Sequence, residues 1–516
     1  MAHIVLINPR FDPSFWGLEY ALDLVGPKAI LPVAALPLLA ALTPAEHHVE
    51  LLDENVEPID YDRCARADIV GLTGMSVQRF RMLEIIDELK RRGCFVVVGG
   101  PWATVQEDDF NHLVDAIFVG EAEMTWPQFL RDWAAGHHLR RYEQAERTDM
   151  TRVPVPRHDL LKMKRYALGS IQFSRGCPFT CEFCDIIVTF GRKPRLKTSE
   201  QIIAELEALW RGHGVDTVFI VDDNLIGNKK AIKVILRAVL AWQQAHDYPL
   251  MFLTEASLDL ADDRELMALM SEVNIRIVFV GVETPNEASL RETEKLQNLR
   301  KGGSIVEKLH RIQEAGLEVW SGHILGFDHD GPDIFERQIT FIEQARIITA
   351  MVGMLSAIPK TPLHARLARE GRLDASDRPD HGTNVIPLGL ARDQLRQGYV
   401  GVMQRLYAPE AYFARVRSLY LEGPLASLEH SPKRSRLAAF RWAVKTAVAG
   451  AFTVLRLQTR VDDPALRKVY RSILGEALRR RSPLLLQILA MKCAMHYHAA
   501  RLVRDMMASP RPVNTL

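Results

Sequence analysis

The stretch SRGCPFTCEFCD, residues 174–185, places Cys177, Cys181 and Cys184 within eight residues. This C-x3-C-x2-C spacing on one loop lets three thiolates converge on the corners of an iron–sulfur cube. No fourth cysteine lies nearby, so one iron would stay open to bind a reactant. The alternatives are a zinc knuckle or three ordinary buried thiols. Zinc would need a fourth Cys or His close by, and the nearest histidine, His158, precedes the loop. The pattern therefore favours a [4Fe-4S] cluster.

Composition is that of an ordinary globular protein, with 516 residues, 47% hydrophobic and 25% charged. This length predicts two or three domains. The formal net charge of +1 argues against a nucleic-acid partner. The other cysteines, Cys64, Cys94 and Cys493, are scattered and do not form a disulfide framework. Free thiols and an oxygen-sensitive cluster both indicate the reducing cytoplasm.

Neither a secretory signal nor a membrane-spanning segment is expected. Met1, Ala2 and His3 run straight into a predicted strand, without a basic region followed by an apolar core. The longest apolar run, residues 30–42, is too short to span a bilayer and contains Pro32 and Pro37.

The first 135 residues read as a doubly wound parallel sheet. β-rich runs at residues 3–9, 49–53, 69–73, 95–98 and 116–119 alternate with helical patterns such as residues 77–92. Ligands of such sheets bind at the carboxyl ends of the strands, where Asn8, Gly99 and Gly100 would lie. Gly99 and Gly100 either let the backbone approach a ligand closely or only form a tight turn. Residues 136–165 follow as a linker, because the prolines of the VPVPR run at 153–157 hold the chain extended.

Residues 166–374 repeat a strand–helix unit six times, which predicts a partial (β/α)6 barrel. The strands are predicted at residues 170–174, 217–222, 250–255, 276–283, 318–327 and 350–358, and the clearest helices at 199–210, 229–244 and 305–315. Thr198 or Ser199 is the expected N-cap of the first of these helices.

Carboxylates follow several of these strands. Asp222 and Asp223 end the second strand, Glu255 the third and Glu283 the fourth. Each one alone could be a solvated loop residue. At successive strand ends of one barrel they favour a shared site, because a barrel's active site lies at the carboxyl ends of its strands.

The tail, residues 375–516, is helical by pattern. Basic residues outnumber acidic ones between residues 431 and 481, and apolar patches at 446–455 and 484–489 are interleaved with them. One interpretation is a surface that touches anionic lipid headgroups. The other is a helical cap with a solvated basic face.

The chain resembles the cobalamin-binding-domain (class B) radical S-adenosylmethionine (SAM) enzymes, and within them the subgroup of the hopanoid C-2 methylases. The resemblance rests on SFW at residues 14–16, VGPK at 25–28, GGP at 99–101, FSRGCPFTCEFCDII at 173–187, GRKPR at 191–195, VDDNLIGNKK at 221–230 and TEAS at 254–257. It runs to about residue 373 and then thins.

The resemblance implies roles for several residues. The open iron would bind the amino and carboxylate groups of SAM, whose cleavage yields a 5′-deoxyadenosyl radical. Asp222 or Asp223 would hold the amino group, in a D-D-N motif where relatives more often have G-G-E. Gly322 and Gly326 would pack against the adenine, with Phe183 beside the same ring. Cobalamin would lie on the sheet domain, and the absence of a D-x-H-x-x-G motif does not support a histidine ligand to cobalt.

The implied function is cobalamin-dependent methyl transfer to an unactivated carbon of a lipid-like or secondary-metabolite substrate. A reducing partner such as flavodoxin or ferredoxin would supply electrons in the cytoplasm. The basic C-terminal region would add a peripheral contact with the inner face of the membrane.

Three other functions are alternatives to this one. One is radical SAM cyclisation or rearrangement without methyl transfer. A tRNA methylthiolating enzyme fits worse, because only Cys64 and Cys94 are available N-terminally for a second cluster. A non-catalytic corrinoid or lipid sensor or carrier would have no use for an open iron.

Overall fold

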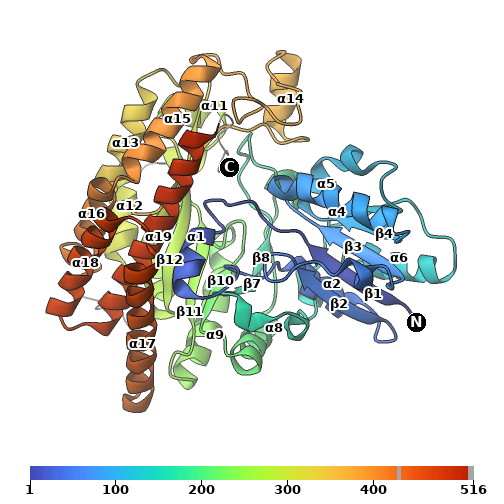
Figure 1. The fold of residues 1–516 in the computed structure, drawn as a ribbon, viewed down its shortest axis with the longest axis horizontal. Helices are drawn as coiled ribbons and strands as arrows, with labels where there is room; N and C mark the ends of the chain where they lie inside the picture. Colours follow the sequence, from blue (N-terminus) through green and yellow to red (C-terminus); the bar gives the residue numbers. More distant parts are fainter. Residues whose placement is uncertain (301, 427–431, 510–516) are drawn as a thin grey trace. The chain divides into compact units, whose positions relative to one another are not determined.

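The computed structural model describes residues 1–300, 302–426 and 432–509, and the chain forms two compact units (Figure 1). The first comprises residues 1–12, 31–238 and 358–365, and the second residues 13–30, 239–357 and 366–516. Two of the boundaries between the units fall inside helices, one in α9 (Lys229–Ala245) and one in α14 (Pro362–Arg369). Each unit contains parallel strands with helices between them.

A six-stranded parallel sheet lies in the first unit, in the order β2-β1-β3-β4-β5-β6. Its strands are β1 (His3–Asn8), β2 (His48–Asp53), β3 (Ile69–Thr73), β4 (Val96–Gly99), β5 (Ala116–Val119) and β6 (Arg141–Glu143). The accompanying helices are α2 (Ala35–Leu42), α3 (Tyr61–Cys64), α4 (Arg79–Arg91), α5 (Pro101–Val105) and α6 (Thr125–Ala134). An order that reverses at β1 is the flavodoxin-like form of the doubly wound sheet.

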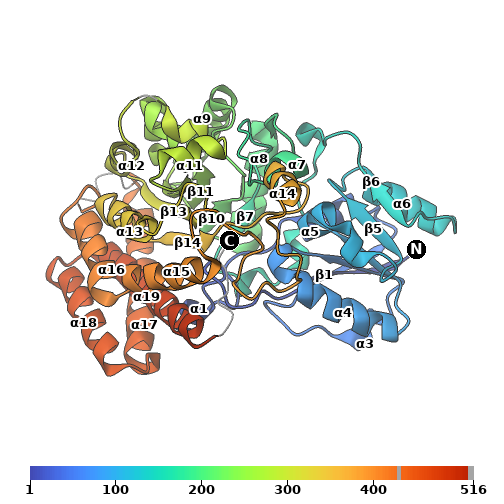
Figure 2. The same cartoon turned by 90° about the horizontal axis from the view of Figure 1, so that it is seen from above.

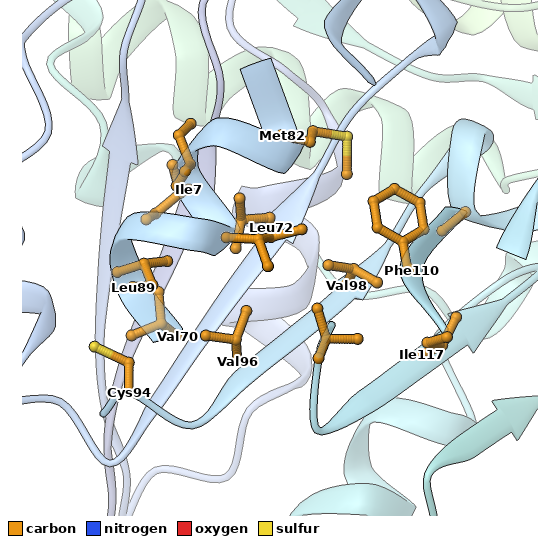
Figure 3. Close-up of a cluster of buried hydrophobic side chains, with 14 of the residues drawn as sticks. Ile7, Val70, Leu72, Met82, Leu89, Cys94, Val96, Val98, Phe110 and Ile117 are labelled. Atoms are coloured by element: carbon orange, nitrogen blue, oxygen red, sulfur yellow. The ribbon is translucent and has the colours of Figure 1, made fainter. Parts of the chain in front are cut away.

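Apolar spacing explains why these segments fold as they do. Every residue of β3 is buried, as expected for a central parallel strand covered on both faces. On α4 the buried residues include Met82, Ile85 and Leu89, at intervals of three and four that line one helix face. These side chains join Val96 and Val98 of β4 in one core (Figure 3).

Strand β6 was not predicted and falls within the segment that the sequence indicated as a linker. It pairs in parallel with β5, through Ile117 opposite Arg141 and Val119 opposite Glu143. Only Tyr142 of its three residues is buried. A three-residue edge strand with two charged members carries too weak an alternation to be recognised from the sequence.

The six strands of the predicted barrel are all present, in the predicted order. β7 (Gly169–Ile171) and β10 (Thr217–Ile220) pair in parallel in the first unit. In the second unit β11 (Met251–Ala256), β12 (Ile275–Glu283), β13 (Glu318–Leu325) and β14 (Ala350–Met354) pair successively in parallel. The helices between them are α8 (Ser199–Glu207), α9, α10 (Arg264–Glu272), α11 (Glu287–Glu292), α12 (Ile305–Glu314) and α13 (Ile334–Gln344). The predicted α/β class is therefore confirmed.

The N-cap of α8 is Thr198, which is one of the two residues expected for this position. Its hydroxyl accepts from the Gln201 N–H, and the Gln201 side chain accepts from the Thr198 N–H. This reciprocal pair satisfies two of the donors that a helix start leaves unpaired.

The C-terminal region is helical, as predicted. Helix α14 (Pro362–Arg369) precedes it, and the region itself contains α15 (Arg392–Leu406), α16 (Pro409–Val416), α17 (Arg436–Arg460), α18 (Pro464–Arg479) and α19 (Pro483–Ala508). In the second unit α17, α18 and α1 (Glu19–Val25) lie against α19 (Figures 1 and 2). The buried Lys492 of α19 pairs with Glu318 of β13, which also accepts from the Tyr420 hydroxyl. This ionic contact ties the helices to the strands.

Among the described residues one helix, α17, is long and apolar enough to cross a membrane by length and composition. No membrane-spanning segment was expected here, although the apolar patch predicted at residues 446–455 lies within this helix. On its own this finding is a weak indication, because core helices of soluble proteins pass the same test.

His323 of β13 is buried in its neutral form. Its Nε2 lies 2.6 Å from the Ser321 Oγ, and its Nδ1 lies 2.6 Å from the Gln338 Nε2. Since the Gln338 amide nitrogen is a donor, the ring proton is assigned to Nε2. Burial lowers the pKa of His323 from 6.5 to about 3.

This shift predicts a loss of stability in acid. The folded state favours the neutral form of His323. The stability that this neutral imidazole contributes to the folded protein is therefore complete above about pH 6.5 and is lost as the pH falls toward 3. Each pH unit in that window should cost about 1.4 kcal/mol. Thermal unfolding of His323→Gln between pH 7 and 4.5 should show a flatter pH dependence than the wild type. The control His137→Gln, at a side chain 69% exposed, should keep the wild-type slope. Identical slopes in all three proteins would contradict this account.

Candidate active site

The three cysteines lie on a loop, residues 176–194, that we call the cluster loop. It is closed at its base by β8 (Ser174–Arg175) and β9 (Arg195–Leu196), which pair antiparallel. Inside the loop the Cys177 N–H donates to the Gly191 carbonyl at 3.2 Å, and the Cys184 N–H to the Cys181 carbonyl at 3.1 Å. Cys181 is buried, whereas Cys177 and Cys184 are half-buried. The three cysteines therefore lie on one short loop whose ends are paired and whose backbone is bonded internally.

Gly176 is required at the start of this loop. Its φ is +93°, a left-handed conformation that side chains rarely adopt. A Cβ at this position would lie 2.9 Å from the Gly191 carbonyl oxygen and 3.0 Å from that of Lys193. The backbone therefore folds back on itself more tightly than any other residue would allow.

Asp222 lies two residues after the end of β10 and binds the base of the cluster loop. Its Oδ1 accepts from the Phe173 N–H and its Oδ2 from the Ser174 hydroxyl, both at 2.6 Å. Asp223 is half-buried and accepts from the Gly176 N–H at 3.1 Å. Burial raises the pKa of Asp222 to about 7 and that of Asp223 to about 6.

The donor set fits an iron–sulfur cluster. Three cysteine thiols on one loop are the ligand type that such clusters take. The Asn224 amide donates toward the Cys177 Sγ at 3.8 Å. A hydrogen bond to a ligand sulfur is one of the contacts by which a protein tunes a cluster's reduction potential.

A buried ionic network, which we call the Glu121 clasp, fixes both strands at the loop base. Glu121 follows β5 and is 1% exposed. Its carboxylate accepts from Arg175 of β8 at 2.9 Å and from Arg195 of β9 at 3.0 Å. Glu123 adds a second contact to Arg175 at 2.6 Å, and the Thr148 N–H donates to Glu121 at 2.8 Å. The clasp therefore fastens the cluster loop to the six-stranded sheet.

The residues predicted to bind cobalamin contact other residues of the protein in this structure. Asn8 ends β1, donates to Asp53 and accepts from Gln78, each at 3.1 Å. Gly99 ends β4, and Gly100 follows with φ +93°. A Cβ on Gly100 would lie 2.2 Å from the Thr73 hydroxyl oxygen, so close packing alone explains this glycine.

The remaining predicted residues belong to the second unit, except Phe183, which is half-buried on the cluster loop. Glu255 lies near the end of β11, and Glu283 ends β12 with φ +68° and an ion pair of 2.6 Å to Lys295. A Cβ on Gly322 would lie 3.1 Å from the Phe279 ring, and one on Gly326 would lie 2.7 Å from Leu395. A side chain at Gly322 would therefore require a small shift of the Phe279 ring, and Gly326 also has φ +98°, which favours glycine by itself.

The first unit therefore brings the three cysteines together with Asp222 and Asp223. Sequence reasoning missed Glu121, Glu123, Arg175 and Arg195. Two glutamates directly after a predicted strand were a signal, but nothing in the sequence indicated that they meet arginines more than fifty residues away.

Glu121→Gln tests the clasp. The change leaves the buried guanidinium of Arg175 short of one anionic partner, which should cost about 3 to 5 kcal/mol of stability. We expect a lower unfolding midpoint and less iron bound per chain. Glu143→Gln removes an ion pair at a carboxylate 53% exposed and should change stability by less than about 1 kcal/mol. Wild-type iron content and midpoint in Glu121→Gln would overturn the role given to the clasp.

Sequence comparisons match residues 171–340 to the radical SAM superfamily and residues 27–130 to the B12 binding domain. Residues 361–510 match a domain of unknown function, DUF4070. The chain is 42% identical to the uncharacterized methyltransferase sll1242 of Synechocystis, over 81% of this chain and 78% of the relative. It is 36% identical to the hopanoid C-2 methylase of Rhodopseudomonas palustris, over 80% of this chain and 78% of that protein.

Solved structures share the fold. The cobalamin-dependent radical enzyme OxsB superposes with a TM-score of 0.62 at 14% identity, covering 98% of this chain and 80% of OxsB. TsrM from Kitasatospora setae gives 0.59 at 17% identity, covering 77% of this chain and 82% of TsrM. The cofactors are therefore a [4Fe-4S] cluster, SAM and cobalamin, and the reaction is methylation of a carbon. The chain belongs to the cobalamin-binding radical SAM methyltransferases, in the subgroup that includes the hopanoid C-2 methylase.

Proposed function

We propose that the protein methylates an unactivated carbon of a polycyclic isoprenoid lipid. The observation that carries this proposal is the 36% identity to a hopanoid C-2 methylase over 80% of the chain. A reducing partner such as flavodoxin or ferredoxin would supply electrons in the cytoplasm. The basic C-terminal region would bring the enzyme into peripheral contact with the membrane that holds such lipids.

Cys177, Cys181 and Cys184 are the proposed ligands of the cluster. When bound, the cluster supplies the electron that cleaves SAM, and cobalamin supplies a methyl carrier. The protein's own part is positioning. The Glu121 clasp and the Asp222 carboxylate fix the loop from two sides, so that the thiols keep one arrangement.

Of the two carboxylates in the D-D-N motif, we propose that Asp223 holds the amino group of SAM. Asp222 is 1% exposed, and both its oxygens accept bonds from the base of the cluster loop. Asp223 is half-buried and contacts the loop through Oδ2. An ammonium group beside Asp223 would favour its ionised form and offset the effect of burial. The roles predicted for Phe183, Glu255, Glu283, Gly322, Gly326, Asn8, Gly99 and Gly100 stay predictions.

A labelled-methyl assay tests the reaction. Anaerobic protein with reductant, cobalamin and methyl-deuterated SAM should add one labelled methyl group to a polycyclic isoprenoid, detected by mass spectrometry. Cys181→Ala should abolish both this product and 5′-deoxyadenosine, whereas the matched change Cys94→Ala, at a buried free thiol, should retain them. A Cys181→Ala protein that still forms 5′-deoxyadenosine would refute the cluster assignment. SAM cleavage without methylated lipid would refute the substrate class.

The assignment of Asp223 gives a separate prediction. Asp223→Asn should raise the KM for SAM at least about tenfold, because one charge-assisted hydrogen bond is lost. Asp222→Asn should instead lower the unfolding midpoint or the iron content, with a smaller effect on KM. If Asp222→Asn raised the KM for SAM and Asp223→Asn lowered the iron content instead, the roles of the two aspartates would have to be exchanged.

A further inference from the structure

Helix α17 turns its large apolar side chains outward. Exposed apolar residues recur along it every three or four positions, which places them on one helix face. They are Leu437, Phe440, Val444, Val448, Phe452 and Leu455, with exposed fractions between 43% and 67%. We call this set the outer face of α17. An exposed apolar stripe of this length is unusual on a soluble monomer and marks an interaction surface.

The inner face of α17 is made mainly of small residues. Its buried members are Thr446, Gly450, Thr453 and Leu457. A Cβ at Gly450 would lie 3.4 Å from the backbone of Gln487 in α19, so the two helices approach closely there. The helix is therefore held to its own unit through small side chains, whereas the large outer ones stay 43% to 67% exposed.

Positive charge surrounds the outer face. Residues 433–460 contain seven Lys and Arg residues and no Asp or Glu. The Arg456 guanidinium lies 4.0 Å from the centre of the Phe452 ring, and that of Arg434 lies 4.7 Å from the Trp442 ring. Cationic and apolar groups therefore share one surface. This combination matches a bilayer interface, where anionic headgroups lie above acyl chains.

We propose that α17 lies flat on an anionic lipid bilayer, with its outer face among the acyl chains and its arginines and lysines at the phosphates. Crossing the bilayer would carry the exposed Arg441 and Lys445 into the hydrocarbon and separate the inner face from α19. The proposal deepens the membrane contact of the proposed function by naming the helix, its contacting residues and the lipid charge. It does not depend on methyl transfer.

Vesicle flotation of the full chain tests this proposal. The wild-type protein should float with vesicles of phosphatidylcholine and phosphatidylglycerol in equal parts, and bind pure phosphatidylcholine at least about tenfold more weakly. The double variant Val444→Gln, Val448→Gln should bind the anionic vesicles at least about tenfold more weakly than the wild type. The control Val234→Gln, at a side chain 59% exposed on α9, should bind as the wild type does.

The outcomes separate this proposal from the proposed reaction. Flotation is measured on protein with and without its cofactors, and methyl transfer on lipid dissolved in detergent. The double variant should lose flotation and keep methyl transfer. Equal flotation of wild type and double variant would overturn the proposal. A vesicle-free dimer that the wild type forms and the double variant loses would also overturn it, by identifying a second copy as the occupant. Flotation without methyl transfer would support it and count only against the proposed reaction.

Discussion

The carboxylate of Glu121 is the contact on which the geometry of the cluster loop depends. It is 1% exposed and lies between the guanidinium groups of Arg175 and Arg195, one from each strand at the base of the loop. Two cations and two glutamates buried together satisfy one another, whereas any one of them alone would be costly to bury. The sheet that matches the B12 binding domain and the loop that carries the cysteines are thereby joined within one compact unit.

The same arrangement explains why the two aspartates of the D-D-N motif are assigned different roles. Asp222 supports the loop from the barrel side by accepting from the Phe173 N–H and the Ser174 hydroxyl. Glu121 supports it from the side of the six-stranded sheet. The loop is thus held on both flanks by buried carboxylates, and we propose that the half-buried Asp223 faces a ligand. Rigid support of this kind is what an enzyme contributes when its cofactors carry the difficult chemistry.

Local signals in the sequence were sufficient for much of this fold. Residues 69–73 are a strand because a buried parallel strand is apolar throughout, and Thr198 begins a helix because its side chain and that of Gln201 cap it reciprocally. The cysteine spacing indicated the cluster because the chemistry of three thiolates is contained in the motif itself.

Signals that depend on distant partners were missed. Strand β6 is defined by its pairing with β5, and Glu121 by arginines far along the chain. The ligand roles predicted for the glycines at positions 100, 322 and 326 stay predictions, and the sequence did not indicate that side chains of Thr73, Phe279 and Leu395 pack close to them. The apolar patch at residues 446–455 was predicted as one possible lipid-contacting surface, and it includes Val448, Phe452 and Leu455 of the outer face. The other members, Leu437, Phe440 and Val444, were not predicted, because interspersed basic residues interrupt the apolar run and only the helix brings all six onto one side.

We expect one compact unit to carry both the cluster and cobalamin. The most direct test is the visible spectrum of protein purified without oxygen from cells supplied with cobalamin, with iron and corrinoid quantified. About four irons and one corrinoid should be bound per chain. Iron without corrinoid, even after reconstitution, would contradict this expectation.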